Sequence, residues 1–360
     1  MKKVYNFNAG PAALPKEVLE KAQHEFLNYR GTGLSVMELS HRSKHYEAIQ
    51  EKAMQLLRAL MRIPEDYEIL FMQGGASLQF TTIPSNFLTG DKIANYCLTG
   101  SWSEKALKEA SRVGRTHIAS SSKINNYTFI PENLTLSDKP AYVHLTSNNT
   151  IFGTQWQSFP TLPQSVPLIA DMSSDILSKQ IELEKFSLIY AGAQKNLGPS
   201  GVTVVIIKKD LLDTCPEPLP TMLNYQTYAT NKSLYNTPPT YSIYMLSLVL
   251  EWVENQGGIK EIEKRNTEKA NRLYHTIDSS HGFYNGPSQT NSRSKMNVVF
   301  TLPTEKLTLS FLKQADEKGF VGLAGHRLIG GCRASIYNAV SLADCEELAS
   351  FMEKFRTDSI

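Results

Sequence analysis

The stretch Tyr190-Ala191-Gly192-Ala193-Gln194-Lys195-Asn196-Leu197-Gly198-Pro199-Ser200-Gly201 decides the fold of this chain. Apolar residues at 188–191 and 202–207 flank it and predict two buried strands, joined by a turn rich in Gly and Pro. Such a turn fixes Lys195 close to the sheet. A lysine removed from water there loses its proton more easily and can form a Schiff base with a carbonyl compound. The alternative is an exposed loop lysine, which is the usual state of a single Lys.

The first two thirds of the chain alternate short apolar runs with helical patterns. We expect further strands at residues 68–72, 92–98, 141–145 and 166–170, and helices at residues 15–30, 46–62, 78–87 and 103–112. This alternation predicts an α/β fold in which helices flank a mostly parallel sheet. Ligands of such sheets bind at the carboxyl ends of the strands.

The last third of the chain has a different pattern. We expect helices at residues 242–254, 259–278, 308–318 and 342–354, and strands at residues 296–302 and 334–337. The breaker cluster Asn255-Gln256-Gly257-Gly258 interrupts the helical region. We therefore expect a large domain over residues 16–256 and a smaller α+β domain over residues 257–360, with residues 1–15 packing near the smaller one.

Three more strand ends carry groups that suit a ligand. Gly74-Gly75-Ala76-Ser77 joins a strand to a helix, where small residues and free N–H groups favour an anion such as phosphate; a plain tight turn is the alternative. Trp102 follows a strand and offers a flat face for stacking on an aromatic ligand, or else packs within its own domain. Asp171 ends the apolar run at residues 166–170, where its carboxylate either caps a helix, bonds to a nearby serine or serves a ligand.

Together these groups predict a site for pyridoxal phosphate (PLP). Asp171 precedes Lys195 by 24 residues. In a PLP site a lysine binds the cofactor aldehyde, and an acidic residue keeps the pyridine nitrogen protonated so that the ring accepts electrons. An aromatic side chain stacks on the ring, while N–H and hydroxyl groups hold the phosphate.

Five motifs of the chain resemble those of one family. They are residues 6–12 (NFNAGPA), 35–43 (SVMELSHRS), 190–199 (YAGAQKNLGP), 325–327 (GHR) and 330–339 (GGCRASIYNA). Over essentially its whole length the chain resembles the phosphoserine aminotransferases, which are class V aminotransferases of the fold type I PLP enzymes. The resemblance implies a large domain with a mostly parallel, seven-stranded type of sheet, a smaller α+β domain, and PLP as the cofactor.

The resemblance also implies residue roles. Lys195 would be the catalytic residue, which holds the cofactor and moves the proton of the substrate α-carbon. The implied cofactor-binding residues are Ala76, Ser77, Trp102, Thr150, Asp171, Gln194, Lys195, Asn236 and Thr237. The implied substrate-binding residues are His41, Arg42, His326, Arg327 and Arg333.

The family's active form is a homodimer with shared active sites. By resemblance, Asn236 and Thr237 would reach the cofactor phosphate of the neighbouring subunit. Arg333 would bind the substrate α-carboxylate. His326 and Arg327 would act across the interface as part of a pocket for the second anion of the substrate.

The implied reaction moves an amino group reversibly between L-glutamate and 3-phosphohydroxypyruvate, giving O-phospho-L-serine and 2-oxoglutarate in serine biosynthesis. Both amino acids carry a second anion, and an Arg side chain binds carboxylate or phosphate through two hydrogen bonds. Some family members carry Arg where this chain has Ser77. Binding of the substrate phosphate is therefore expected to depend more on His41, Arg42, His326 and Arg327. A second activity on phosphohydroxythreonine, in vitamin B6 synthesis, stays open.

Two other functions are compatible with part of the pattern. Another class V PLP enzyme, such as a cysteine desulfurase, needs a mobile nucleophilic Cys, but Cys332 lies in a tight turn and no flexible Cys loop is evident. A non-catalytic PLP-binding regulator would not need Lys195, Asp171 and Arg333 together.

The composition limits the partners and the compartment. Lys and Arg number 37 against 35 Asp and Glu, for a net charge of +2, which excludes a strongly basic nucleic-acid binder. The four cysteines resemble neither a disulfide framework nor a zinc site, so we expect reduced thiols and no metal site. Neither a signal peptide nor a membrane-spanning stretch is evident. We expect a cytoplasmic protein whose ligands are small molecules, without nucleic-acid or membrane partners.

Overall fold

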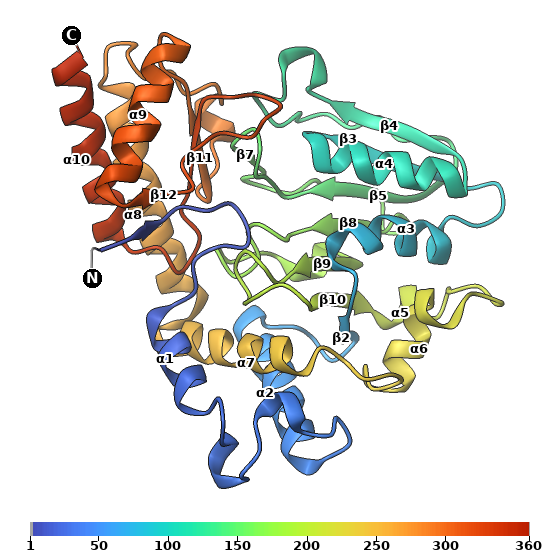
Figure 1. Cartoon of the computed structure of the whole chain (residues 1–360). Coiled ribbons are helices and arrows are strands. Elements are labelled where there is room, and N and C mark those ends of the chain that lie inside the picture. Colours follow the sequence, from blue (N-terminus) through green and yellow to red (C-terminus); the bar gives the residue numbers. More distant parts are fainter. Residues whose placement is uncertain (1–2, 360) are drawn as a thin grey trace.

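A seven-stranded sheet forms the centre of the molecule in the computed structural model, which describes residues 3–359 (Figure 1). Its strands are β2 (Tyr67–Met72), β3 (Ile93–Leu98), β4 (Thr116–Ser121), β5 (Pro140–Thr146), β8 (Leu168–Asp171), β9 (Leu188–Gly192) and β10 (Thr203–Lys208). They lie in the order β2-β10-β9-β8-β5-β3-β4, and β10 is antiparallel to both of its neighbours while the remaining pairs are parallel. The α/β fold with a mostly parallel, seven-stranded sheet is thus confirmed.

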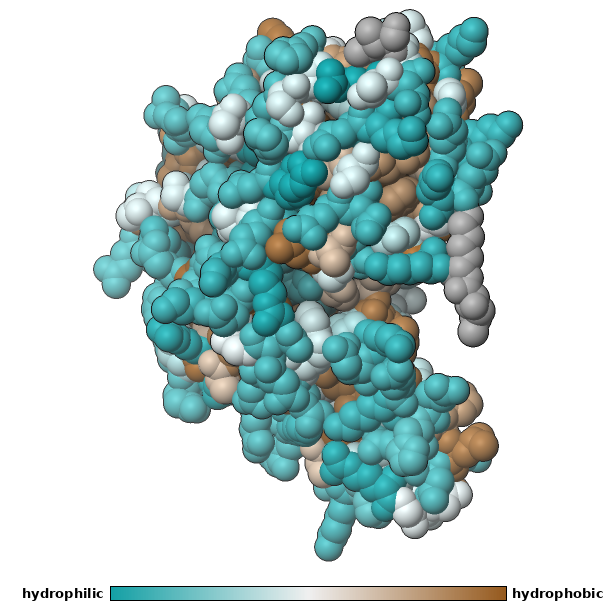
Figure 2. All heavy atoms as spheres, turned by 90° about the vertical axis from the view of Figure 1, so that its left-hand side faces the viewer, coloured by the Kyte–Doolittle hydropathy of each residue, from teal (hydrophilic) through white to brown (hydrophobic). Residues whose placement is uncertain are grey.

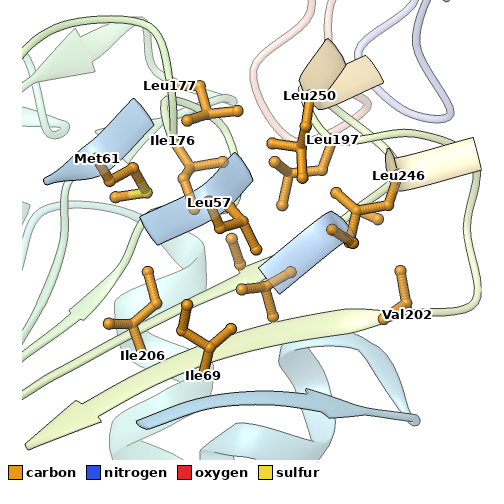
Figure 3. Packing of buried hydrophobic residues seen from close by; sticks show 14 of the residues in the cluster. Leu57, Met61, Ile69, Ile176, Leu177, Leu197, Val202, Ile206, Leu246 and Leu250 are labelled. Carbon is orange, nitrogen blue, oxygen red and sulfur yellow. The ribbon is translucent and has the colours of Figure 1, made fainter. Parts of the chain in front are cut away.

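Both faces of the sheet are buried by helices. In β10, Val204 and Ile206 face one core cluster while Val205 and Ile207 face another, since successive side chains of a strand point to opposite faces. The first cluster contains side chains of α2 (Lys44–Met61) and α7 (Thr240–Asn255), and Figure 3 shows Leu57 of α2 above this face of the sheet. The second contains side chains of α3 (Gly75–Phe87) and α4 (Ser101–Val113). Each buried Val or Ile contributes roughly 1.5–3 kcal/mol, which explains why the strands are rich in these residues.

The helices have the following bounds. They are α1 (Lys16–His24), α2 (Lys44–Met61), α3 (Gly75–Phe87), α4 (Ser101–Val113), α5 (Lys209–Leu212), α6 (Tyr225–Thr230), α7 (Thr240–Asn255), α8 (Gly258–Asp278), α9 (Glu305–Lys318) and α10 (Leu342–Ser359). Short 3-10 helices occupy Tyr29–Gly31, Val36–Glu38, Lys123–Asn125, Leu183–Lys185, Thr221–Leu223 and Thr290–Ser292.

The helices α8, α9 and α10 gather to one side of the sheet (Figure 1). They share a separate hydrophobic cluster with the antiparallel pair β11 (Asn297–Phe300) and β13 (Cys332–Ser335). The N-terminal strand β1 (Tyr5–Asn6) pairs with β12 (Phe320–Val321), and β6 (Asn148–Asn149) pairs with β7 (Thr154–Gln155). The division of the chain into two domains at residue 256 stays a prediction.

Three local expectations were wrong. The first helix ends at His24, well before residue 30, because residues 25–43 turn through glycines with positive φ at Gly31 and Gly33. The helix α4 begins at Ser101, so Trp102 lies in its first turn and not ahead of it. The edge strand β4 was not expected, because its residues are only partly buried and lack a strong apolar pattern.

The face of the molecule that carries α1 and α10 is mostly hydrophilic (Figure 2). Figure 2 shows the face on which α1 and α10 lie, where apolar atoms are confined to scattered spots. Within residues 3–359, no helix combines the length and the apolar character that crossing a membrane requires.

Candidate active site

Lys195 lies in the turn that follows β9. The amides of Leu197 and Gly198 both donate to the carbonyl of Ala193, at 3.0 and 2.9 Å, and this closes the turn around the lysine. The Lys195 Nζ donates to Thr150 Oγ1 at 2.7 Å. Burial lowers the pKa of Lys195 to about 8, although the charge of Asp171 opposes the shift. A substantial fraction of Lys195 is therefore a neutral amine near pH 8.

Asp171 is the last residue of β8 and is buried. Its Oδ1 accepts hydrogen bonds from the Ser173 amide at 2.9 Å and the Ser173 hydroxyl at 2.6 Å. No helix follows, so the carboxylate closes a turn and does not cap a helix. Burial raises the pKa of Asp171, while the bonds from Ser173 and the charge of Lys195 oppose that rise. A buried carboxylate with so few donors suits a cationic hydrogen-bond donor as a further partner.

A cavity of about 120 Å³ lies between Lys195 and Asp171. Its walls come from the carboxyl ends of several parallel strands, as the sequence predicts for a ligand site. The lining residues are Gly75, Ala76, Ser77, Trp102, Thr146, Asn148, Asp171, Ser173, Ser174, Gln194 and Lys195. The structure therefore brings together six of the predicted cofactor-binding residues, and Thr150 joins them through its bond to Lys195.

The start of α3 forms one end of this cavity. Gly74 has φ +84°, and a Cβ there would lie 2.6 Å from the side chain of Leu78, so this turn requires glycine. The N–H groups of Gly75, Ala76 and Ser77 belong to the first turn of the helix, where no preceding carbonyl can accept them. Free N–H groups at a helix start attract an anion, so this end of the cavity suits a phosphate.

Arg333 lies on β13, next to the same lysine. Its Nη1 donates to the carbonyl of Thr150 at 3.4 Å, while its buried Nε has no partner among residues 3–359. Burial lowers the pKa of the guanidinium. His326 lies near Arg333 of the same chain, and its pKa is lowered by burial and then by the charges of Arg333, Arg327 and Lys105. This concentration of cations with an unpaired donor is suited to an anionic ligand.

The other predicted residues lie apart from the cavity. His41 and Arg42 belong to the segment between α1 and α2, which projects at the far end of the molecule from β4 (Figure 1). The Thr237 carbonyl accepts a bond from Gln73, at 3.0 Å, but Asn236 and Thr237 do not line the cavity. Among residues 3–359, no hydrogen bond joins these four residues to Lys195 or Asp171.

Several residues of the site were not predicted. Asn148 lines the cavity, and the buried Tyr337 hydroxyl donates to the carbonyl of Ala9 at 2.8 Å beside the lysine. The two bonds from Ser173 to Asp171, by contrast, confirm the alternative in which a nearby serine satisfies this carboxylate. Nothing in the local sequence around Tyr337 indicates that it meets the N-terminal segment.

The cysteines are not placed for nucleophilic catalysis. Cys332 is buried, and burial raises its pKa to about 12, so that it is a thiol near neutral pH. The four cysteines are free, and three of them are buried. This geometry disfavours the desulfurase alternative.

Comparison with known proteins identifies the family. The sequence model for "Aminotransferase class-V" matches residues 4–348. The chain belongs to the class V aminotransferase family.

Individual class V relatives match over their full length. The chain is 62% identical to the phosphoserine aminotransferase of Geobacillus kaustophilus, over 99% of each chain. The structure of phosphoserine aminotransferase from Bacillus circulans subsp. alkalophilus superposes with a TM-score of 0.98, at 54% identity over 99% of each chain. That of PLP-bound phosphoserine aminotransferase from Trichomonas vaginalis gives a TM-score of 0.92, at 38% identity over 98% of this chain and 100% of that one.

Proposed function

We propose that this chain is a phosphoserine aminotransferase, which uses PLP to transfer an amino group between L-glutamate and 3-phosphohydroxypyruvate in serine biosynthesis. The observation that carries the proposal is the cavity in which Lys195, Asp171 and the start of α3 meet beside Arg333. Full-length similarity to phosphoserine aminotransferases supports the choice of substrates.

The donor set of the cavity fits PLP. Lys195 would bind the cofactor aldehyde, Asp171 would accept a hydrogen bond from the pyridinium, and the N–H groups of Ala76 and Ser77 would hold the phosphate. Trp102 provides an aromatic face on the cavity wall. The remaining cofactor-binding residues in this proposal are Thr150, Gln194, Asn236 and Thr237. When bound, PLP supplies an electron sink for the negative charge that develops at the substrate α-carbon.

Lys195 is suited to move the α-proton. Because burial lowers its pKa to about 8, its Nζ can take a proton and return it near neutral pH. The hydrogen bond to Thr150 Oγ1 holds the amine in one orientation while it does so. Asp171 is kept from the solvent, so its charge acts on the ligand with little screening.

Substrate binding divides between two groups of cations. Arg333, with its free Nε, binds the α-carboxylate that every substrate of this reaction carries. His41, Arg42, His326 and Arg327 bind the distal anion, which is a phosphate in one half-reaction and a carboxylate in the other. Ser77 is neutral, so Arg42 and Arg327 supply the permanent positive charge for the phosphate, and the two histidines can donate hydrogen bonds to it.

We further propose that two copies of the chain assemble and share their active sites. Several exposed large apolar side chains lie on α1, on the segment that follows it and near residue 235; they are Leu19, Phe26, Leu27, Leu34, Met37 and Tyr235. An apolar surface of this kind favours burial against another protein. The segment also carries His41 and Arg42, which do not line the cavity and form no hydrogen bond to Lys195 or Asp171 within residues 3–359. In a homodimer we propose that these two residues, and not His326 and Arg327 as the resemblance implies, serve the partner's cavity together with Asn236 and Thr237, because His326 lies near Arg333 of its own chain.

The proposal also covers the domains and the compartment. A large domain over residues 16–256 and a small one over residues 257–360 agree with the separate hydrophobic cluster of α8, α9 and α10. A cytoplasmic location agrees with the four unpaired cysteines.

A panel of acceptors tests the function. The glutamate-treated holoenzyme is mixed with 2-oxo acids that differ only in the presence of a phosphate, and amino-acid formation is followed. We expect 3-phosphohydroxypyruvate to be preferred by at least about 10²-fold in kcat/KM, because the phosphate engages several cations. A preference for unphosphorylated acceptors would overturn the substrate assignment. Including the phosphorylated 2-oxo acid that gives phosphohydroxythreonine also decides the question of vitamin B6 synthesis.

A further inference from the structure

Lys269 is the only lysine among residues 3–359 whose side chain is fully buried, with an exposed fraction of 1%. It lies on α8 and forms no ion pair with a carboxylate of the described chain. Instead its Nζ donates to three backbone carbonyls, those of Ile336 at 3.0 Å, Tyr337 at 2.8 Å and Val340 at 2.9 Å. The buried ammonium group therefore donates the hydrogen bonds that backbone N–H groups would otherwise supply to the carbonyls of the turn at residues 336–340.

The three acceptors match the protonated form of Lys269. An ammonium group has three donors and no acceptor, whereas a neutral amine would direct a lone pair at one carbonyl. Within residues 3–359, no backbone N–H donates to the carbonyls of Ile336 or Val340. Without the ammonium, both carbonyls would be buried and unpaired, at a large cost to this conformation of the turn.

The groups around Lys269 shift its pKa in opposite directions. Burial, and to a smaller extent the charge of Arg265 on the same helix, lower its pKa to about 8. Cys345 and Asp344, which approach from α10, raise it. The three carbonyls also favour the charged form because they bond to it. The ammonium is therefore the form that the geometry supports at neutral pH.

Asn338 connects the turn to Lys195. The backbone N–H of Asn338 donates to Asn196 Oδ1 at 3.0 Å, and Asn196 follows the catalytic lysine directly. Asn266, which lies one turn before Lys269 on α8, donates to Asn338 Oδ1 at 2.9 Å. Asn266 and Lys269, on one face of α8, thus both bond to the turn, and through Asn338 the turn bonds to the segment that carries Lys195.

The turn also reaches the site through Tyr337. Its hydroxyl donates to the Ala9 carbonyl at 2.8 Å and lies within hydrogen-bonding reach of the Thr150 side chain. Thr150 accepts the bond from Lys195 Nζ through its hydroxyl, and it accepts from Arg333 through its carbonyl. A shift of the turn would therefore move the groups that orient both Lys195 and Arg333.

We propose that Lys269 is a positioning residue, whose ammonium fixes the turn at residues 336–340 and thereby the positions of Lys195 and Arg333. The kinetic part of this inference rests on the proposed aminotransferase function. The structural part does not, because the contacts of the turn can be followed in the cofactor-free chain.

The test is the variant Lys269→Met, which keeps the length of the side chain and removes its donors. The matched control is Tyr284→Phe, which removes another buried donor of the C-terminal cluster, the bond from Tyr284 to the Met352 carbonyl at 2.8 Å. Within residues 3–359, no hydrogen bond joins Tyr284 or Met352 to residues 336–340.

We expect three changes in Lys269→Met that are absent from the control. Hydrogen exchange at the Asn338 and Val340 amides in the cofactor-free chain speeds up by roughly tenfold or more, because these amides bond within and beside the turn. The pH midpoint of the visible absorbance of Lys195-bound cofactor shifts. With the two substrates, kcat falls roughly tenfold and the KM for glutamate rises.

Two results would overturn the inference. One is unchanged exchange at the turn; the other is faster exchange with wild-type absorbance titration, kcat and KM, which would make Lys269 a purely structural residue. If Lys269→Met does not fold, Asn266→Ala tests the same link more mildly, with about threefold effects expected in the same directions. If the wild-type protein transaminates none of the acceptors, the proposed function fails, while exchange and absorbance still decide the role of Lys269.

Discussion

The cavity beside Lys195 and the residues that we propose for the distal anion of the substrate differ in one respect: a single chain completes the first but not the second. Lys195, Asp171 and the start of α3 line one cavity and are held by short contacts to Thr150 and Ser173. His41 and Arg42 occur on a projecting segment and are not among the described residues that line this cavity. The first region is built from strand ends of one sheet, whereas the second depends on a surface segment.

This difference separates two tasks. Covalent chemistry needs a desolvated lysine and a buried carboxylate, which only a well-packed core provides. Recognition of two different anions needs flexible charged side chains, which can come from a second copy of the chain. We therefore expect variants of the first region to lose chemistry and variants of the second to lose substrate recognition.

The largest effect should come from Lys195→Ala, which removes the group to which we assign proton transfer and cofactor binding. We expect kcat to fall by about 10⁴-fold, with the visible absorbance of lysine-bound PLP lost. The control is Lys139→Ala, whose lysine pairs with Asp91 at the surface and should be silent. Transamination by Lys195→Ala at a wild-type rate would contradict the proposed role.

The double variant His41→Ala/Arg42→Glu tests the second region. Reversing a charge opposite a phosphate costs several kcal/mol, so kcat/KM for 3-phosphohydroxypyruvate should fall by roughly 10³-fold. The affinity for PLP should stay unchanged, as measured by titrating the cofactor-free chain. Weakened cofactor binding with normal substrate use would mean that the two regions are not separate.

The variant Arg333→Lys tests the proposed binding of the substrate α-carboxylate by Arg333, which lies beside Lys195. Lys keeps the charge but loses the planar pair of donors, so we expect kcat/KM to fall about 10²-fold for both amino-acid substrates, since both carry an α-carboxylate. Steady-state kinetics with glutamate and with phosphoserine measure this. A loss confined to phosphoserine would assign Arg333 to the distal anion instead.

The lowered pKa of Lys195 should also make the stability of the fold depend on pH. The pKa of Lys195 falls from 10.5 to about 8 on folding, so between these values the unfolded chain binds more protons than the folded chain. Unfolding free energy therefore rises with pH in this window, and the cofactor-free wild type should gain about 2 kcal/mol over Lys195→Met between about pH 7 and about pH 9.5. Urea unfolding of both proteins at the two pH values measures the gain. Parallel stabilities of the two proteins would show that Lys195 is not desolvated.

The predictable parts of the site are those set by local sequence. Lys195, Asp171 and the Gly74–Ser77 turn follow apolar strands, and strand ends of a parallel sheet converge at one edge. The position of Trp102 inside α4 was missed because the helix begins two residues earlier than its apolar pattern indicates. Lys269 was not predictable, because its three carbonyl partners converge only when α8 packs against residues 336–340. The pairing of β1 with β12 joins residues more than 300 positions apart and has no local signal either.

The most direct test of the shared active site uses hybrid dimers. Chains carrying Lys195→Ala and chains carrying His41→Ala/Arg42→Glu are co-expressed with different tags, and dimers that hold both are purified. If each cavity uses the partner's His41 and Arg42, one of the two sites in every hybrid is native, and activity should recover to about half that of the wild type. If each cavity uses its own, no site is native, and activity no higher than that of the His41→Ala/Arg42→Glu parent would contradict the account.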